Sequence, residues 1–294
     1  MNSNPLLTVF TPTYNRAHLL PLLYESLCKQ TFKNFEWVVV DDGSKDHTKE
    51  VLASFAQDEQ AFFPIRCFYQ ENGGKHRAIN HGVREAKGEL FFISDSDDKL
   101  PPDALENVAK VYEDIKEDNS FAGICGLDGT FEGKVIGSGL PQEVIDDTSV
   151  AIRFKHRVTG DMKEVFRLSV LKEFPFPEIA NEQFCPETLL WNRIATRYKL
   201  RYFNKIIYLA EYQEDGISAE IVTVRMKSPV ASMMTYAELN QIPMMPFLQK
   251  CKAAVNYWRF RFCANKDVVP PKISPWWGWV IPMAWLMHQK DKTK

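Results

Sequence analysis

The stretch FEWVVVDDGS, residues 35–44, decides the fold class of this 294-residue chain. Its first part, Phe35–Val40, is mostly apolar and ends in three valines, which predicts a buried strand. The strand is expected to stop at Asp41–Ser44, because Asp-Asp-Gly-Ser is a turn sequence. Three runs of the same kind lie on either side of it: Leu6–Thr11, Ile65–Tyr69 and Leu90–Ser94.

The segments between these runs carry apolar residues at helical spacing. They predict helices over Asn15–Lys29, Thr48–Ala56 and His76–Ala86. Strands that alternate with helices indicate an α/β fold whose sheet is mainly parallel. In such a sheet, ligands bind beyond the carboxyl ends of the strands, so the residues that follow each strand are the candidates for a functional site.

Composition excludes several other classes of protein. The chain has 36 Lys and Arg against 38 Asp and Glu, so nucleic acid is not expected as the main partner. Its six cysteines form no Cys-x-x-Cys pair, which fits a reducing cytosol better than a disulfide framework or a zinc site. No secretion leader is visible, and the longest uncharged apolar run, Ile273–Met287, is shorter than the ~20 residues that span a bilayer. A cytoplasmic location is expected.

The C-terminal segment 225–294 differs from the rest in charge. It holds 11 Lys and Arg against three acidic residues, and five of the seven tryptophans of the chain. Basic charge with interfacial aromatic residues predicts a segment that lies on an anionic membrane surface, and hence a peripheral location. Two alternatives are that the tryptophans pack onto the rest of the chain or form a homodimer interface.

The four predicted strands are followed by polar segments that one edge of the sheet would bring together: 11–16, 41–44, 72–75 and 95–98. The last of these, Asp95–Asp98, reads Asp-Ser-Asp-Asp directly after an apolar strand. Carboxylates in this arrangement suit a hard cation such as Mg²⁺ or Mn²⁺. Each segment on its own is also compatible with an ordinary solvated turn or helix cap.

Taken in order, the motifs resemble glycosyltransferase family two, which has the GT-A fold. The resemblance is carried by PTYNR (12–16), QTFKNFEWVVVDDGSKDHT (30–48), NGGKHRAINHGVREAKGE (72–89) and DSDD (95–98). It is strong over residues 6–105 and looser to about residue 216. It implies a nucleotide-sugar-binding half at 1–105 and an acceptor and catalytic half at 106–224, followed by a helical, aromatic-rich extension at 225–294.

The resemblance also implies roles for single residues at the nucleotide. Pro12 and Tyr14 match the positions that cradle and stack a uracil-like base, and Asp42 matches the carboxylate that accepts its N3–H. Asp97 matches the direct metal ligand, with Asp95 as the second carboxylate of the metal site and closer to ribose and sugar. Further residues expected near the nucleotide are Arg16, Asn72, Lys75 and Ser96.

The acceptor side departs from the family pattern. Members usually carry Glu-Asp at a helix start with the aspartate as base, whereas this chain has Pro186-Glu187. Aligning Trp191 with the usual aromatic residue places Glu187 on the base position, with Trp191 itself near the acceptor. Glu182 is the competing base, and Glu187 is alternatively a structural first-turn residue. Asp161 is expected in the acceptor pocket, with a plain turn as the alternative.

The activity implied is a metal-dependent, inverting transfer of one sugar from a nucleotide-diphosphate sugar to a hydroxyl acceptor. UDP is preferred over GDP as the nucleotide, with Mn²⁺ or Mg²⁺ as cofactor, and a glycan or lipid-linked acceptor in bacterial surface polysaccharide or glycolipid assembly. The chain lacks the Gln-x-x-Arg-Trp motif of processive synthases, which favours single-sugar addition. The alternatives are a catalytically inactive, glycosyltransferase-like binding protein and, less favoured, a sugar-phosphate nucleotidyltransferase, whose glycine-rich loop after the first strand is missing here.

Overall fold

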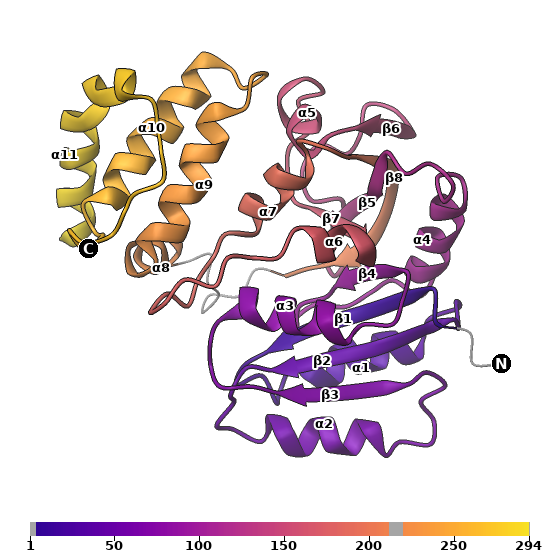
Figure 1. The fold of residues 1–294 in the computed structure, drawn as a ribbon. Coiled ribbons are helices and arrows are strands. Elements are labelled where there is room, and N and C mark those ends of the chain that lie inside the picture. The colour runs from indigo at the N-terminus through magenta and orange to yellow at the C-terminus, as the bar shows by residue number, and fades with distance from the viewer. Residues whose placement is uncertain (1–3, 212–219, 294) are drawn as a thin grey trace. The chain divides into compact units, whose positions relative to one another are not determined.

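A computed structural model describes residues 4–211 and 220–293, which form two compact units (Figure 1). Of the described residues, the sheet unit combines 4–175 with Ile194–Glu211, and the helical unit combines Phe176–Arg193 with 220–293. Residues 176–193 therefore group with the C-terminal helices.

The sheet unit is built on one eight-stranded mixed sheet. β1, β2, β3 and β4 run parallel, β7 is antiparallel to both β4 and β5, and β8 is parallel to β5 and antiparallel to β6. The expected mainly parallel α/β sheet of the N-terminal half is confirmed. In spatial order the strands are β3 (Ile65–Tyr69), β2 (Phe35–Asp41), β1 (Leu7–Thr13), β4 (Leu90–Ile93), β7 (Met162–Arg167), β5 (Phe121–Gly129), β8 (Lys199–Leu209) and β6 (Val144–Asp147).

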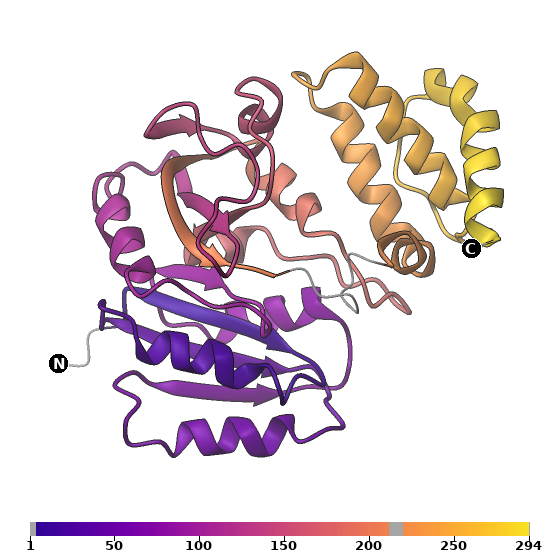
Figure 2. The ribbon, with the colours of Figure 1, turned by 180° about the vertical axis from the view of Figure 1, so that it is seen from behind.

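Helices cover both faces of this sheet (Figures 1 and 2). α1 (Leu20–Cys28), α2 (Thr48–Ala56) and α4 (Ala104–Glu113) bury their leucines and valines in the main core with β1, β2 and β4. α3 (Lys75–Glu85) and α6 (Leu168–Glu173) lie on the other face, and α5 (Ser149–Phe154) follows β6. Gly82 of α3 is needed there, because a Cβ at this position would meet the ring of Phe10 at 2.1 Å.

β1 is longer than the sequence predicts, since it passes through Pro12 and ends at Thr13. Ser94 N–H donates to the Phe10 carbonyl and Asp42 N–H to the Thr13 carbonyl, so even-numbered residues of β1 face β4 and odd-numbered ones face β2. Pro12 therefore faces the β4 side, where the pairing with β4 has already ended at Phe10. The missing N–H of Pro12 costs no ladder hydrogen bond, which is the condition for proline in a strand.

α1 is shorter than predicted and begins at Leu20 rather than near Asn15. Asn15 has a left-handed backbone with φ 53°, which a helix excludes. Its side-chain oxygen accepts from Lys45 N–H, and its own N–H donates to Ser44 Oγ. Pairing with the loop after β2 therefore replaces the first turn expected from leucine spacing alone.

The helical unit consists of short helices that pack on each other through small and aromatic side chains. Ala254, Val255, Trp277, Val280 and Ala284 form one buried cluster, and Met233, Ala237, Tyr257 and Phe260 form another. No helix of the described residues is long and apolar enough to cross a bilayer. The elements are α7 (Glu187–Ile194), α8 (Ile221–Lys227), α9 (Pro229–Gln241), α10 (Phe247–Arg261), the 3₁₀ helix η1 (Pro275–Val280) and α11 (Ile281–Lys292).

A buried carboxylate, Glu36, ties the start of the sheet together. It accepts hydrogen bonds from Thr8 Oγ1 at 2.7 Å, Lys87 N–H at 2.7 Å and Arg66 Nη1 at 3.0 Å. Arg66 also pairs with Glu85, at 3.4 Å, but that carboxylate is much more exposed. The two glutamates bind the same arginine but differ in burial, so substitutions at the two positions compare a buried carboxylate with an exposed one.

We expect Glu36→Ala to lower the free energy of unfolding by about 2–4 kcal/mol, because it leaves a buried hydroxyl and a backbone N–H without their acceptor and removes the buried one of the two carboxylates that Arg66 binds. Glu85→Ala should lower it by less than about 1 kcal/mol, as for other exposed ion pairs. Urea denaturation of both variants measures the two values. Equal losses would contradict the assignment of Glu36 as the central acceptor.

Candidate active site

The carboxylate of Asp42, just beyond β2, organises the loop that precedes α3. Its Oδ1 accepts from the Gln70 side chain at 2.7 Å and from Gly73 N–H at 2.9 Å. Its Oδ2 accepts from Gly74 N–H at 2.7 Å and from the Asn72 side-chain amide at 3.3 Å. Four donors on one carboxylate fix the loop at the carboxyl edge of the sheet, where Gly74 takes the left-handed φ of 95° that favours glycine.

Residues after β1 form the neighbouring part of this edge. Tyr14 directly follows β1 and keeps 43% of its surface exposed, so its ring is free to contact a ligand. Asp41 accepts from Ser44 N–H in the predicted turn, and Arg16 N–H donates to Thr48 Oγ1. The loops after β1 and β2 are thus joined by several hydrogen bonds, which bring the expected nucleotide residues Pro12, Tyr14, Arg16 and Asp42 to one edge.

Lys75, the first residue of α3, forms an ion pair with Asp95 after β4, with Nζ 2.7 Å from Oδ1 and 2.9 Å from Oδ2. The structure therefore brings together two sequence-predicted residues that are separated by a strand and a helix. Burial opposes ionisation of Asp95, but Lys75 and Lys163 outweigh it and hold the pKa of Asp95 below its usual value. Ser96, next in the chain, is buried.

Asp97 and Asp98 lie in a region of excess negative charge. Burial and the charge of Asp95 raise the pKa of Asp97, while Arg16 and Lys75 partly counteract them. Burial, followed by the charge of Asp95, raises the pKa of Asp98 to about 7. Adjacent carboxylates whose ionisation is resisted in this way form a site where an added cation is electrostatically favoured.

The donor set fits a hard divalent cation that is only partly held by protein. Among the residues that the structure describes, no three His, Cys, Asp or Glu side chains are arranged to hold a metal ion. Asp95 and Asp97 are the two carboxylates of this turn that could be shared by a cation. Mg²⁺ and related ions are commonly bound in this way, by one or two carboxylates together with substrate phosphates and water.

Two residues of the site were missed by sequence reasoning, Tyr208 and Lys163. The Tyr208 hydroxyl donates to Asp98 Oδ2 at 2.7 Å and accepts from Asp95 N–H at 2.8 Å, so it holds both ends of the Asp95–Asp98 turn. The Lys163 ammonium lies 3.5 Å from the centre of the Tyr208 ring and acts electrostatically on Asp95 and Asp98. They come from β8 and β7, and no local motif marks either one.

The residues expected on the acceptor side fall into both units. Asp161 is exposed in the sheet unit, directly after Gly160, whose φ is 86°. Glu187 and Trp191 belong to α7 of the helical unit, where Glu187 is the half-buried first residue and Trp191 makes an edge contact with Phe176.

Glu182, the competing base, is buried and already bonded. Its two carboxylate oxygens accept from Val230 N–H at 2.7 Å and Ala231 N–H at 2.9 Å, at the start of α9. A carboxylate at a helix N-terminus is favoured there, and both of its oxygens are in use. Its geometry is that of a helix cap.

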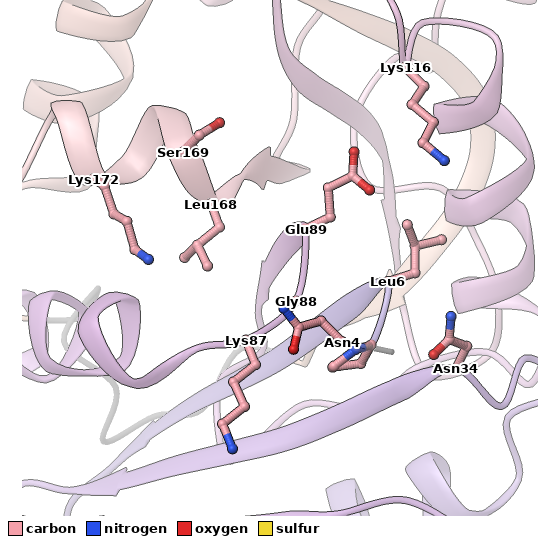
Figure 3. Close-up of a pocket in the computed structure, with 11 residues that line it drawn as sticks. Asn4, Leu6, Asn34, Lys87, Gly88, Glu89, Lys116, Leu168, Ser169 and Lys172 are labelled. Carbon is pink, nitrogen blue, oxygen red and sulfur yellow. The ribbon is translucent and has the colours of Figure 1, made fainter. Parts of the chain in front are cut away.

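A cavity of about 600 Å³ lies elsewhere, at the opposite edge of the sheet (Figure 3). Its lining includes Leu6 and Asn34, which precede β1 and β2, and Glu89, which precedes β4. These are the amino ends of the parallel strands. The cavity is therefore separate from the site, which is formed by the loops at the carboxyl ends.

Comparison with known proteins defines the class. The family model described as glycosyl transferase family 2 matches residues 8–132. The glycosyltransferase GlyG of Streptococcus pneumoniae is 35% identical over 228 residues, which cover 72% of each chain. The chain belongs to glycosyltransferase family 2. A Campylobacter jejuni protein named GalNAc(5)-diNAcBac-PP-undecaprenol beta-1,3-glucosyltransferase is 29% identical over 194 residues, covering 64% of this chain and 59% of that one.

Other relatives match over a smaller share of their length. An uncharacterized glycosyltransferase of Rickettsia typhi is 33% identical over 125 residues, which are 42% of this chain and 37% of that protein. The match to a Rickettsia bellii protein covers 29% of its length.

Solved structures show the same GT-A fold. S. aureus TarS in complex with UDP-GlcNAc aligns with a TM-score of 0.59 and 19% identity over 86% of this chain and 81% of that one. A mannosyltransferase from Pyrobaculum calidifontis in complex with GDP-Man and Mn²⁺ aligns with a TM-score of 0.58 and 18% identity. The alignment covers 97% of this chain and 74% of that one. The expected GT-A class is confirmed.

We expect Tyr208→Phe to lower the free energy of unfolding by about 1–3 kcal/mol, because a buried carboxyl and a backbone N–H lose their partner. Tyr202→Phe is the matched control on the same strand, since its buried hydroxyl has no hydrogen-bond partner within the described residues. That change should be neutral within about 0.5 kcal/mol or stabilising. Chemical denaturation compares the two, and a larger loss in Tyr202→Phe would refute the assigned role of Tyr208.

Proposed function

We propose that this protein transfers one sugar from a nucleotide-diphosphate sugar to a hydroxyl acceptor, with inversion at the sugar carbon. The observation that carries the proposal is the Asp42-bound loop, which holds Lys75 against Asp95 at the carboxyl edge of the parallel strands. This edge is where α/β sheets bind ligands, and it combines an exposed aromatic ring, cations for phosphate and carboxylates for a metal. Membership of glycosyltransferase family 2 supports the same activity.

UDP is the preferred nucleotide in this proposal. The exposed Tyr14 ring offers a stacking surface, and Asp42 offers an acceptor for the N3–H of uracil. Both Asp42 oxygens already accept two hydrogen bonds each, so the base would have to replace the weakest of them, the 3.3 Å bond from Asn72. A TarS structure with UDP-GlcNAc supports UDP, whereas the GDP-Man complex of the other structural relative keeps GDP as the alternative.

Mn²⁺ or Mg²⁺ is the proposed cofactor, with Asp97 as its direct ligand and Asp95 as the second carboxylate. When bound, the cation would offset the charge that grows on the leaving diphosphate. Lys75 and Lys163 would hold the same phosphates from the protein side, because both ammonium groups already lie within electrostatic range of Asp95. Tyr208 would hold the Asp95–Asp98 turn beside the cation through its two hydrogen bonds.

Glu187 is the proposed general base, which takes the proton of the attacking acceptor hydroxyl. It starts α7, at the position that matches the family base, and is half-buried. Both carboxylate oxygens of Glu182 accept from the first turn of α9, which is the arrangement of a helix cap. Asp161 and Trp191 are proposed to contact the acceptor.

The acceptor we propose is a glycan or a lipid-linked oligosaccharide in bacterial surface polysaccharide or glycolipid assembly. The undecaprenol-linked substrate in the name of the Campylobacter relative supports a lipid-linked acceptor. The enzyme would then act in the cytoplasm beside the membrane.

We expect Asp97→Asn to abolish sugar transfer and metal-stimulated hydrolysis of UDP-sugars, because it removes one charge from an oxygen-only ligand set. Excess EDTA should have the same effect on the unchanged protein. Asp118→Asn, an exposed change before β5 at the other end of the sheet, should keep full activity. The activities of the two variants and of the unchanged protein are measured as hydrolysis of several UDP- and GDP-sugars, with and without Mn²⁺.

Full activity of Asp97→Asn, or of the protein in EDTA, would refute the metal role. A well-folded protein that binds UDP-sugars but neither transfers nor hydrolyses them would instead identify an inactive, glycosyltransferase-like binding protein.

We expect Glu187→Gln to reduce kcat by about 10²–10⁴, the usual contribution of a general base, with little change in nucleotide-sugar affinity. Glu182→Gln should keep kcat and lower stability, because an amide nitrogen would then face the N–H groups of α9. Single-turnover rates and melting temperatures of both variants separate the two roles. The opposite pattern would make Glu182 the base.

A further inference from the structure

The polypeptide from η1 into α11 has one face that anchors it to the helical unit. Trp277, Val280, Ala284 and His288 are buried, and their spacing of three, four and four residues puts them on one side of a helix. Trp277, Val280 and Ala284 pack with Ala254 and Val255 of α10. This inner face accounts for the folding of the segment.

The outer face of the same segment is also apolar, which folding does not require. Trp276, Trp279, Met283 and Leu286 follow at spacings of three, four and three residues, so they line the outer side. Their side chains are 60%, 55%, 55% and 62% exposed. We call these four residues the outer stripe.

The outer stripe continues onto the start of α10. Phe247 is exposed, and its ring lies 6.2 Å from Trp276 and 5.9 Å from Trp277, centre to centre. Leu248 beside it is exposed as well. The outer stripe and the start of α10 thus meet where Trp276 contacts Phe247. Exposed apolar residues that gather in this way mark interaction sites.

The surroundings of the outer stripe are basic. Two of the three acidic residues in 225–294 are neutralised within the helical unit, because Glu238 pairs with Arg193 and Asp291 pairs with Arg259. Lys290 lies four residues beyond Leu286, on the same side of α11, and Lys292 follows it. Lys252 on α10 is exposed. Lys294, which was counted among the basic residues, lies outside the described part of the chain.

We propose that the outer stripe, with Phe247 and Leu248, is the surface by which this protein binds an anionic lipid bilayer. Tryptophans insert at the level of the headgroups, leucine and methionine reach the first acyl carbons, and the lysines meet the anionic headgroups. Docking of this kind needs no spanning helix. The proposed membrane binding does not depend on the proposed catalysis. It would place the helical unit, which includes α7, at the membrane surface.

Charge favours a bilayer over a second copy of the chain as the occupant of this surface. A twofold dimer would bring the same positively charged surface against itself, since each partner presents the same patch. An anionic bilayer supplies the opposite charge. Each lysine near an anionic surface adds about 1 kcal/mol to the binding free energy, which is about fivefold in affinity, and a vesicle experiment can measure a change of this size.

The test is flotation of the full-length protein with vesicles of phosphatidylglycerol and phosphatidylcholine, and with phosphatidylcholine alone. We expect flotation with the anionic vesicles, release as salt rises from about 0.1 M to about 1 M, and little flotation with the neutral ones. The double variant Met283→Gln with Leu286→Gln should bind at least about tenfold more weakly. Lys290→Gln should lose about fivefold at low salt, because Lys290 lies on the same side of α11 as Leu286.

Two controls keep the outcome specific. Val144→Gln changes an exposed apolar residue of the sheet unit and should float like the unchanged protein, and so should the catalytic variant Asp97→Asn. Circular dichroism and melting temperatures confirm that the stripe variants fold.

Several results would overturn the proposal. It fails if the folded protein stays in the soluble fraction with anionic vesicles at low salt, or if the stripe variants float unchanged. A doubled mass in light scattering that Met283→Gln with Leu286→Gln abolishes, without flotation, would show a homodimer interface instead. Loss of transfer in Asp97→Asn together with normal flotation separates membrane binding from the proposed activity.

Discussion

The site depends on one carboxylate that sits at the end of a parallel strand. Asp42 accepts two backbone N–H groups and two side-chain amides from the segment between β3 and α3. Without this acceptor, the N–H groups of Gly73 and Gly74 would lack a partner at a partly buried edge, which is costly. Because the loop is fixed there, α3 begins at Lys75 with its ammonium group on Asp95. The proposed nucleotide side and the acidic side of the site are therefore connected through a single loop.

The acidic turn that follows β4 would be unfavourable without its surroundings. Asp95, Asp97 and Asp98 repel one another in a partly buried place, and the raised pKa of Asp97 and of Asp98 reflects this. Lys75 and Lys163 offset part of the charge, and Tyr208 satisfies the turn by hydrogen bonds. A protein rarely keeps such a cluster for stability alone, and perturbed carboxylates in one place are typical of functional sites. The remaining excess charge is what a metal bound together with a diphosphate would balance.

Local sequence was sufficient for the parts of the site that lie next to strands. β2, α2 and the turn at Asp41–Ser44 are signalled by apolar runs and turn residues within a few positions, and the structure has them there. The predicted ends of β1 and α1 were wrong, because contacts with distant residues overrule the local preference of the sequence for strand or helix. Pro12 continues β1 because β4 ends beside it, and α1 starts late because Asn15 bonds to the next loop.

The residues that distant strands contribute to the site could not be predicted, for the same reason. Tyr208 and Lys163 approach the acidic turn only because β7 and β8 are inserted into the sheet next to β4 and β5. The family match of residues 8–132 ends before both of them. A lysine and a tyrosine within ordinary strand sequences give no signal of their own, so only the strand order reveals them.

The organisation of the helical unit explains why its two proposed roles are physically linked. Arg193 of α7 forms a two-pronged ion pair with Glu238 of α9, with Nε and Nη2 2.8 and 2.7 Å from the two carboxylate oxygens. Glu182, in the segment that leads to α7, holds the first turn of α9. The segment that carries the proposed base is thus bonded to α9 at two places, Glu182 and Arg193. Deleting those helices would remove the support of Glu187 together with the lipid-binding surface, so a truncated chain could not distinguish loss of membrane binding from loss of catalysis. Substitutions on the outer stripe leave the inner face and both of these contacts in place, so unlike a truncation they test membrane binding without removing the support of Glu187.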